Sequence, residues 1–466
     1  MVFTSVYYFL FFISYFLFFN FIKSGYRLHL VVVGSLIFYG WGNPAMIFVP
    51  VILSAIAFWG GRWAVGMEEG LVVRNRLLGL VVLLLIPLTY FKYKHFLYNE
   101  IIVPIVGAST VSFGVALPLG ISFMTFTIVS YVVDVYKKRF PPAQSFFHIF
   151  AYILYFPRLI AGPIIRPSEL IPQLLRNKST TMGSVGFGLT LFTIGLVKKI
   201  FFADSMGDVV DPVFDNPMGH SLLTYWLAML GYTVQIYCDF SGYTDMALGS
   251  SIMLGVRLPI NFNKPYIAIN LQDFWHRWHI TLSKWLRQHI YIPLGGNRCS
   301  RPKYLSNIIV TMVVCGIWHG ANWTFLLWGI LHGIGLVVIG VTKFSQTATR
   351  AMKIIPNQLK WLLTFVFIVV TWVFFRSPNV DTARIILIGA FTGDLNFDIV
   401  FFEANVFYLT LLGLFAIVHR FDSLSNVRFV YRWINKGVLT TFVIIAFATA
   451  IAITTDNPKA FIYFDF

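Results

Sequence analysis

The chain has 466 residues, of which 58% are hydrophobic and only 12% are charged, and its mean hydropathy is +0.75. Soluble proteins carry about 25% charged residues, so this composition excludes a water-soluble protein and indicates a polytopic membrane protein. The 35 Lys and Arg outnumber the 19 Asp and Glu, which gives a net charge of +16. These basic residues occur in short clusters between apolar runs, a pattern typical of cytoplasmic loops that contact anionic lipid headgroups. Membrane lipids are therefore expected partners, and nucleic acid is not.

The first 22 residues are apolar and aromatic almost from the start. They lack a basic leading region and an Ala-x-Ala cleavage site, so we interpret them as a retained membrane span. No polar block or Pro/Gly/Ser linker divides the chain, which favours one polytopic membrane domain over residues 1–466. The three cysteines are odd in number and widely spaced, which favours neither a disulfide framework nor a metal site.

The expected secondary structure is entirely α-helical, because apolar runs of span length follow one another along the chain. The expected apolar helices cover residues 3–22, 28–41, 45–65, 77–91, 101–116, 118–136, 146–161, 183–203, 221–238, 305–319, 323–342, 359–375, 404–418 and 437–454. Several are shorter than the roughly 20 residues that a crossing needs, so we expect about eleven crossings plus re-entrant or amphipathic segments. Basic loops after the first and third spans predict a cytoplasmic location for those loops, with the N-terminus outside.

Polar residues concentrate between residues 235 and 333, which we interpret as the core that carries the chemistry. Asp239 and Asp245 flank a short polar stretch beside an apolar run, and the Asn- and Pro-rich residues 261–266 predict a turn. An amphipathic helix should follow, because seven apolar residues recur at three- and four-residue spacing. They are Leu271, Phe274, Trp275, Trp278, Leu282, Trp285 and Leu286. Asn270 is its expected N-cap, with Asp273 in the first turn.

His319 lies between two apolar runs, at residues 308–317 and 325–341. A histidine among membrane-spanning segments is costly to bury, so it indicates a polar cavity or a partner group. Its imidazole titrates near neutral pH and can accept and return a proton. The alternative is a neutral histidine that hydrogen-bonds a neighbouring helix and takes part in no reaction.

Five motifs in this core resemble those of the bacterial membrane-bound O-acyltransferases, and in particular the alginate O-acetyltransferase branch. They are DFSGYTDMA at 239–247, NFNKPY at 261–266, FWHRWHITLS at 274–283, YIPLGGNR at 291–298 and WHGANW at 318–323. Further matches are FYGWG at 38–42, LPLGISF at 117–123, FPRLIAGP at 156–163 and FIYF at 461–464. Each motif alone is weakly specific, but the ordered set is strong and extends over nearly the whole chain.

The resemblance implies a fold in which helices surround a thinned centre, where funnels from both faces meet. It implies a catalytic role for His319 and a supporting catalytic role for His279. It further implies an enzyme of the bacterial inner membrane that takes an acetyl group from a cytoplasmic donor, acetyl-CoA, and binds no cofactor. That group would cross the membrane for O-acetylation of an extracytoplasmic polysaccharide, alginate or a similar one, through a partner acetyltransferase.

Acyl transfer to a hydroxyl group needs a base for the hydroxyl proton and a donor for the developing oxyanion. His319 fits the base, and the side chains of His279, Asn322 and Arg277 or a backbone N–H fit the donor. Asp239 and Asp245 are six residues apart and do not share one helix face, so an ion pair with a basic residue such as Arg277 is a better interpretation than a carboxylate pair.

Two further residues near His319 have open roles. Trp318 fits either an acyl tunnel or ordinary packing. His332 lies on a different helix face from His319, and we interpret it as a structural or tunnel-lining residue.

Four alternatives remain open from the sequence. Cys315 lies four residues before His319, so a Cys–His nucleophile pair is conceivable, although a small packing residue is the better interpretation. The nearest enzymatic alternative is D-alanylation of teichoic acid from a carrier protein. Two alternatives are not enzymes. One is a proton-coupled transporter or polysaccharide-export component. The other is a scaffold, which has no need of so many titratable groups among apolar spans.

Overall fold

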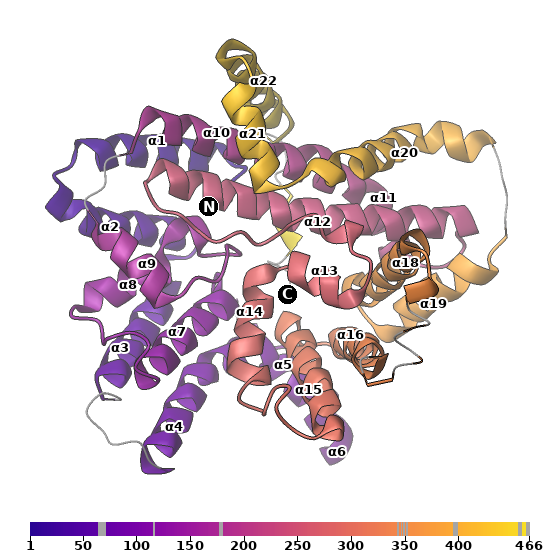
Figure 1. Ribbon diagram of the computed structural model, residues 1–466, viewed down its shortest axis with the longest axis horizontal. Helices are drawn as coiled ribbons and strands as arrows, with labels where there is room; N and C mark the ends of the chain where they lie inside the picture. The colour runs from indigo at the N-terminus through magenta and orange to yellow at the C-terminus, as the bar shows by residue number, and fades with distance from the viewer. Residues whose placement is uncertain are drawn as a thin grey trace. The chain divides into compact units, whose positions relative to one another are not determined.

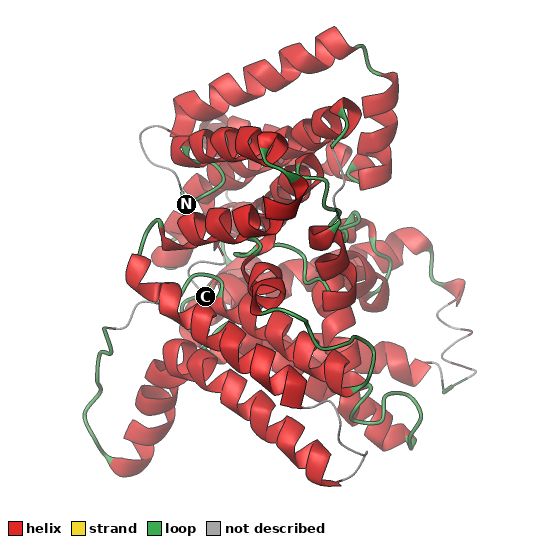
Figure 2. Cartoon of the chain, turned by 90° about the vertical axis from the view of Figure 1, so that its left-hand side faces the viewer, coloured by secondary structure: helices red, strands yellow, loops and turns green. Residues whose placement is uncertain are grey.

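The computed structural model describes the whole chain apart from residues 64–70, 115–116, 177–179, 343, 346, 348–349, 351–352, 395–398, 455–458 and 463–466. All regular elements among the described residues are helices, joined by loops, as Figure 2 shows. The chain divides into two compact units. The first comprises residues 1–196, 243–259 and 435–464, and the second comprises residues 197–242, 260–434 and 465–466. Figure 1 labels the helices of both units.

Besides the C-terminal part of α12 (Leu222–Met253), the first unit contains, over the described residues, ten α-helices from the N-terminal part of the chain and one helix from the C-terminal part of the chain. They are α1 (Val6–Phe21), α2 (Arg27–Gly40), α3 (Phe48–Trp63), α4 (Leu71–Leu88), α5 (Lys94–Phe96), α6 (Val103–Val106), α7 (Ile121–Tyr136), α8 (Phe146–Leu154), α9 (Pro167–Leu175), α10 (Met182–Val197) and α22 (Lys436–Thr454). In this unit α8 packs on α2 and α3, and α7 packs on α3 and α4.

Close helix contact in the first unit depends on small residues. Gly188 of α10 faces Gly249, and a Cβ added at Gly188 would lie 2.7 Å from the Gly249 carbonyl oxygen. Nearby, the hydroxyl groups of Tyr8 and Ser250 form a buried hydrogen bond of 2.8 Å. Small residues at helix crossings and buried polar bonds of this kind are what hold helices together where no water drives their association.

The second unit contains the polar core. Its described helices are α11 (Ser205–Asp215), the N-terminal part of α12 (Leu222–Met253), α13 (Leu271–Arg277), α14 (Ile280–Leu286), α15 (Arg301–His319), α16 (Trp323–Thr342), α18 (Asn357–Arg376), α19 (Val380–Thr392), α20 (Ile399–Val418) and α21 (Leu424–Trp433). Helices α15 and α16 form a tight hairpin, α16 also packs on α13 and α18, and α18 packs on α19.

The α15–α16 hairpin has no room for side chains at its crossing. Gly316 lies opposite Gly329, and a Cβ on Gly316 would meet the carbonyl oxygen of Phe325 and lie 3.1 Å from the Gly329 Cα atom. In the same way a Cβ at Gly320 would collide with the Phe325 ring. Gly316 and Gly320 therefore let α15 end close against α16, with His319 as the last residue of α15.

Six helices within the described ranges are long and apolar enough to cross a membrane. They cover Pro44–Trp63, Val73–Val106, Met182–Asp215, Trp323–Thr342, Asn357–Arg376 and Val400–Phe421, and three shorter apolar helices cover Val6–Phe21, Ile121–Tyr136 and Lys436–Ala450. The all-helical membrane fold expected from the apolar runs is thus confirmed, whereas about eleven crossings remains a prediction. The expectation of one domain over residues 1–466 likewise remains a prediction.

Several expected helices differ from the observed ones. Helix α8 ends at Leu154 where the expected helix ran to residue 161, and α12 continues to Met253 where the expected helix ended at residue 238. The expected helix at 101–116 is wrong for residues 107–114, because α6 ends at Val106 and Gly107 adopts φ +69°, which closes the helix; residues 115–116 lie outside the described residues. The expected continuous amphipathic helix from residue 271 is broken into α13 and α14 at residues 278 and 279. The apolar spacing was correctly recognised, since all seven of its apolar residues are buried. A periodic pattern cannot reveal a two-residue break between two short helices that keep the same buried face.

Candidate active site

His279 occupies the break between α13 and α14. Asn270 caps α13 as expected, with its side-chain oxygen accepting the Asp273 backbone N–H at 2.8 Å. The helix stops at Arg277, and His279 then adopts φ 41° and ψ 54°, in the left-handed region. A non-glycine residue there costs on the order of 1–2 kcal/mol and persists only where surrounding contacts hold it. Here two backbone bonds hold the turn: Asn263 N–H to the Arg277 carbonyl and Ile280 N–H to the Asn261 carbonyl, both 2.9 Å.

The side chain of Asn261 determines which ring nitrogen of His279 carries the proton. Its oxygen accepts the Thr281 backbone N–H at 3.2 Å and the Thr281 hydroxyl at 2.8 Å. Because a backbone N–H can only donate, the oxygen of the Asn261 amide must face this side. His279 Nδ1, at 3.1 Å from the same oxygen, therefore carries a hydrogen and donates it. Nε2 of the neutral ring is then an acceptor, and burial lowers the pKa of His279 to about 3.

His319 lies within a cluster of aromatic rings at the C-terminal end of α15. Its side chain is 3% exposed, and its ring centroid is 4.8 Å from Trp318, 5.2 Å from Trp328 and 5.0 Å from Phe375. Phe375 belongs to α18 and Trp328 to α16, so three helices build the surroundings of the imidazole. This environment excludes most water, which strengthens any interaction between the imidazole and a polar substrate group.

Trp318 brings the two histidines into one site. Its ring lies 4.8 Å from His319 and 6.2 Å from His279, so both imidazoles contact the same indole. Phe240 of α12 packs edge-on against His279 at 4.7 Å. The two residues for which the sequence predicts catalytic roles are 40 positions apart in the chain, and the fold places them around one aromatic side chain.

His332 is buried one layer beyond this group. Its ring is 4.6 Å from Trp328, which in turn contacts His319. His332 Nε2 lies 3.1 Å from the hydroxyl of Thr371 on α18. The side chain is thus held between α16 and α18, and its structural or tunnel-lining role remains a prediction.

Arg277 and Asn322 are engaged in local structure. Arg277 Nε donates to Asp273 at 2.8 Å, and its guanidinium also contacts the Asn263 carbonyl at 3.4 Å. Asn322 donates its amide N–H to the Pro378 carbonyl at 2.7 Å, while its oxygen accepts the Thr324 backbone N–H at 3.0 Å. These contacts explain both residues as parts that fix α13 and the start of α16.

The predicted ion pair of Asp239 with a basic residue is confirmed, but its partner is Lys199 and not Arg277. Asp239 is buried and pairs with Lys199 Nζ at 2.6 Å, and Lys199 also pairs with Asp204 at 2.7 Å. Arg277 instead finds Asp273 one turn away in the same helix, where no long-range folding is needed. Asp245 belongs to the first unit of the chain and is partly exposed.

Cys315 is buried on α15, one helical turn before His319. The described residues contain no group of three or more His, Cys, Asp or Glu arranged to hold a metal ion.

Sequence reasoning missed two contacts. Asn261 was recognised only as part of a turn, although it fixes the proton of His279, and Lys199 was not recognised as the partner of Asp239. The sequence offered one signal for Lys199, which is a lysine inside an expected apolar helix. A charged residue in such a helix predicts a buried partner of opposite charge. Neither the partner of Lys199 nor the contact of Asn261 could be identified without the fold.

Comparisons with known proteins agree with this geometry. The model of the membrane-bound O-acyltransferase family matches residues 136–376, which include both catalytic candidates and Asn261. The chain is 39% identical to a protein of Pseudomonas aeruginosa named probable alginate O-acetylase AlgI, over 77% of this chain and 68% of that protein. It is 38% identical to a peptidoglycan O-acetyltransferase of Helicobacter pylori, over 77% of this chain and 72% of that protein.

A more distant similarity connects the chain to the D-alanylating branch. It is 30% identical to a teichoic acid D-alanyltransferase of Streptococcus thermophilus, over 47% of this chain and 56% of that protein. The family match, the acetyltransferase relatives and the apolar helices lead to one conclusion: the chain belongs to the membrane-bound O-acyltransferase family and is a multi-pass membrane O-acyltransferase.

Proposed function

We propose that the chain transfers an acetyl group from cytoplasmic acetyl-CoA, across the bacterial inner membrane, for O-acetylation of an extracytoplasmic polysaccharide. The observation that carries the chemical part of the proposal is the contact of His279 and His319 with the same Trp318 ring. Two imidazoles in one enclosed, aromatic setting supply the proton acceptor that ester formation needs. The names of the more similar relatives support acetyl over D-alanyl as the transferred group.

In the proposed reaction His319 is the general base. The unprotonated nitrogen of its neutral ring takes the proton from the acceptor hydroxyl, and the hydroxyl oxygen attacks the thioester carbonyl carbon. The new C–O ester bond forms as the C–S bond breaks, and the leaving thiolate of coenzyme A receives the proton from His319. Positioned bases of this kind contribute a factor of roughly 10²–10⁴ to the rate.

The tautomer of His279 restricts its part in this reaction. With Nδ1–H committed to Asn261, Nε2 can accept a hydrogen bond but cannot donate one to an oxyanion. His279 therefore suits orientation of the acceptor hydroxyl better than oxyanion stabilisation. Asn261 Nδ2 is buried and has no hydrogen-bond partner among the described residues, so it is a side-chain donor available near His279.

The acceptor and the sidedness of the reaction are further parts of the proposal. Alginate-type and peptidoglycan-type polysaccharides are both compatible with the relatives' names, and a separate extracytoplasmic acetyltransferase would receive the acetyl group and complete the transfer. The proposed orientation, with the N-terminus outside, rests on the basic loops after the first and third spans. A labelling site at position 43 that only cytoplasmic reagents reach would contradict that orientation.

Purified protein supplied with radiolabelled acetyl-CoA or with a D-alanyl-carrier protein tests the function directly. We expect label to pass from acetyl-CoA to the acceptor in the wild type and to fall by a factor of about 10² or more in His319→Ala, which loses the general base. His276→Ala is the matched control, because His276 is an exposed histidine of the neighbouring helix α13. Circular dichroism and gel filtration of each variant establish that the protein is folded.

Three results would contradict the proposal. Wild-type product formation by folded His319→Ala would remove His319 from the reaction. Transfer from the D-alanyl carrier alone would select the other branch. Transport activity that survives His319→Ala with an altered pH dependence would favour a proton-coupled transporter.

A further inference from the structure

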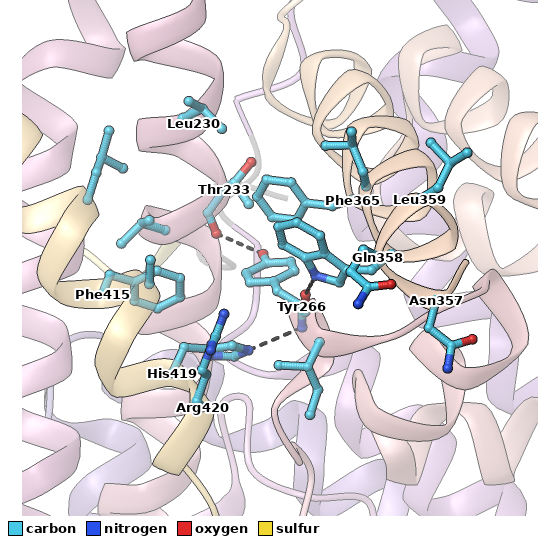
Figure 3. Close-up of a pocket in the computed structure, with 16 residues that line it drawn as sticks. Leu230, Thr233, Tyr266, Asn357, Gln358, Leu359, Phe365, Phe415, His419 and Arg420 are labelled. Atoms are coloured by element: carbon cyan, nitrogen blue, oxygen red, sulfur yellow. Dashed lines mark hydrogen bonds between the residues drawn. The ribbon is translucent and has the colours of Figure 1, made fainter. Parts of the chain in front are cut away.

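The second unit contains a large cavity whose lining includes neither of the two catalytic candidates. Its volume is about 1070 Å³, and residues of α12, α18, α20 and the short helical turn Pro265–Ile267 line it (Figure 3). Pockets for drug-sized ligands usually measure roughly 300–1,000 Å³, so this cavity accommodates a larger molecule. The residues that line most of it are apolar, among them Leu230, Val234, Leu362, Phe365, Leu412 and Phe415.

The wall formed by Tyr266 is fixed by three hydrogen bonds. Its hydroxyl donates to the Thr233 carbonyl at 2.7 Å, its backbone N–H donates to His419 Nε2 at 3.1 Å, and its carbonyl accepts Trp361 Nε1–H at 2.8 Å. These bonds tie α12, α18 and the end of α20 to one tyrosine, as the dashed lines in Figure 3 show. The cavity is therefore a built feature of the fold, since its walls are cross-linked around Tyr266.

Polar groups gather at one end of the cavity. Arg420, His419, Asn357 and Gln358 lie there, whereas Leu230, Leu359 and Phe365 lie toward the other end (Figure 3). Within the described part of the chain, no carboxylate lies within ion-pair distance of Arg420. Arg420 is exposed, and an arginine without an acidic partner favours an anionic ligand group, because a guanidinium donates paired hydrogen bonds to phosphate.

The start of α18 adds a second attraction for an anion. Helix α18 begins at Asn357 after Pro356, and no side chain caps its first N–H groups. The uncapped N–H groups and the positive end of the helix dipole favour a phosphate at this place. Figure 3 draws Arg420 and Asn357 on opposite sides of the lower part of the cavity, so each of these two walls offers one feature that favours an anion.

The membrane is the medium beside this cavity. Two of the helices that line it, α18 and α20, belong to candidate membrane spans, Asn357–Arg376 and Val400–Phe421. The polar end lies at the first residues of one span and the last residues of the other, which is where headgroups meet protein. Leu359 and Leu362 of the lining are 45% and 46% exposed, so the apolar wall is accessible from the side.

We infer that this cavity binds an anionic membrane phospholipid, with its phosphate at Arg420 and its acyl chains along the apolar walls. An amphiphile satisfies both ends of the cavity, whereas an apolar helix from a partner protein would leave Arg420 without a counter-ion. The site is separate from the proposed acyl-transfer chemistry and does not depend on it.

Two variants test the two ends of the site. Arg420→Gln removes the charge that holds the phosphate, and Ala416→Trp places a bulky side chain inside the cavity from α20. The matched controls are Arg432→Gln, an exposed arginine of α21, and Val418→Trp, an exposed residue of α20 outside the lining. Each purified, delipidated protein is melted in detergent with added phosphatidylglycerol or with phosphatidylethanolamine that carries the same acyl chains, and bound lipid is counted by native mass spectrometry.

We expect phosphatidylglycerol to raise the melting temperature of the wild type and of both controls more than phosphatidylethanolamine does. Arg420→Gln should abolish this difference and retain phosphatidylglycerol about tenfold less tightly, which corresponds to one lost charge-assisted hydrogen bond. Ala416→Trp should remove the response to both lipids. If that variant does not fold, the headgroup comparison in Arg420→Gln decides the outcome alone.

The inference is overturned by any of three results. The first is a wild type whose melting temperature responds equally to both lipids or to neither. The second is an Arg420→Gln variant that keeps the full preference for phosphatidylglycerol. The third is a stoichiometric membrane protein that occupies the cavity instead of lipid and is displaced by Ala416→Trp.

Discussion

His279 Nδ1 lies 3.1 Å from the side-chain oxygen of Asn261, an oxygen that also accepts two hydrogen bonds from Thr281. This arrangement settles the tautomer of a buried histidine by means of a residue 18 positions earlier in the chain. The hydrogen on Nδ1 leaves Nε2 as the ring atom that can meet a substrate hydroxyl. In the proposed function, Asn261 is therefore a positioning residue that acts through His279.

Asn261→Asp tests this positioning role. The aspartate still accepts the Nδ1–H bond, but its negative charge stabilises the imidazolium and raises the pKa of His279 above the value of about 3 that burial imposes. Because the unprotonated ring is the proposed active form, the acid side of the pH–rate profile should move to higher pH. The measurement is the pH dependence of acetyl transfer.

Asn263→Asp is the control for that profile, since Asn263 is two residues away and bonds Arg277 through its backbone. The control should keep the wild-type pH dependence. An unchanged profile in folded Asn261→Asp would show that Asn261 does not act through the protonation of His279.

Cys315→Ala tests the covalent alternative. Cys315 is buried one turn before His319, beside the tight crossing of α15 and α16, and we expect it to serve packing alone. The alanine variant should keep near-wild-type acetyl transfer, and no acyl-enzyme should appear on the wild type after acid quench with labelled donor. Loss of activity in a folded alanine variant, together with label on the wild-type protein, would instead establish a thioester intermediate.

Gly316→Ala tests the crossing that positions His319. The added methyl would meet the Phe325 carbonyl and the Gly329 backbone, and backbone atoms cannot move aside as a flexible side chain can. Overpacking of this kind costs about 1–3 kcal/mol, so the melting temperature and activity should both fall. Gly413→Ala on α20 is the control, because nothing lies within 4 Å of its added Cβ, and its melting temperature should not fall. Equal stability of the two variants would contradict the close contact.

Lys199→Met tests the buried ion pairs of the second unit. The change leaves Asp239 and Asp204 without their shared ammonium group, and breaking a buried pair costs about 3–5 kcal/mol. Adding Asp239→Asn to Lys199→Met should recover part of the loss, which thermal melting of the single and double variants measures. Asp273→Asn breaks the half-exposed pair with Arg277 and should cost no more than about 1 kcal/mol. A Lys199→Met protein as stable as the wild type would exclude a structural role for the pair.

The sequence by itself determined the helical membrane fold and the positions of most helices. Apolar runs such as those that became α16 and α18 are local properties of the chain, since the lipid solvent forces each run to satisfy its own backbone hydrogen bonds. The motifs around His279 and His319 also lie in the sequence, and they led to the family that the comparisons confirm. The wrong extension of the helix at 101–116 arose because apolar character alone does not reveal a glycine in the left-handed conformation at position 107.

Only the tertiary structure decided which groups meet. Lys199 and Asp239 are 40 residues apart in the sequence, so their pairing could not be predicted, and Arg277, which the sequence suggested as the partner of Asp239, pairs with Asp273. The break at His279, the proton that Asn261 places on it and the Trp318 ring that joins the two histidines likewise depend on contacts between segments distant in the chain. Hydrogen bonds, ion pairs and ring contacts act over a few ångströms, and the separation of two residues along the sequence does not give their distance in space. Hydrophobicity acts on each segment separately, which is why the membrane helices could be predicted from the sequence and these contacts could not.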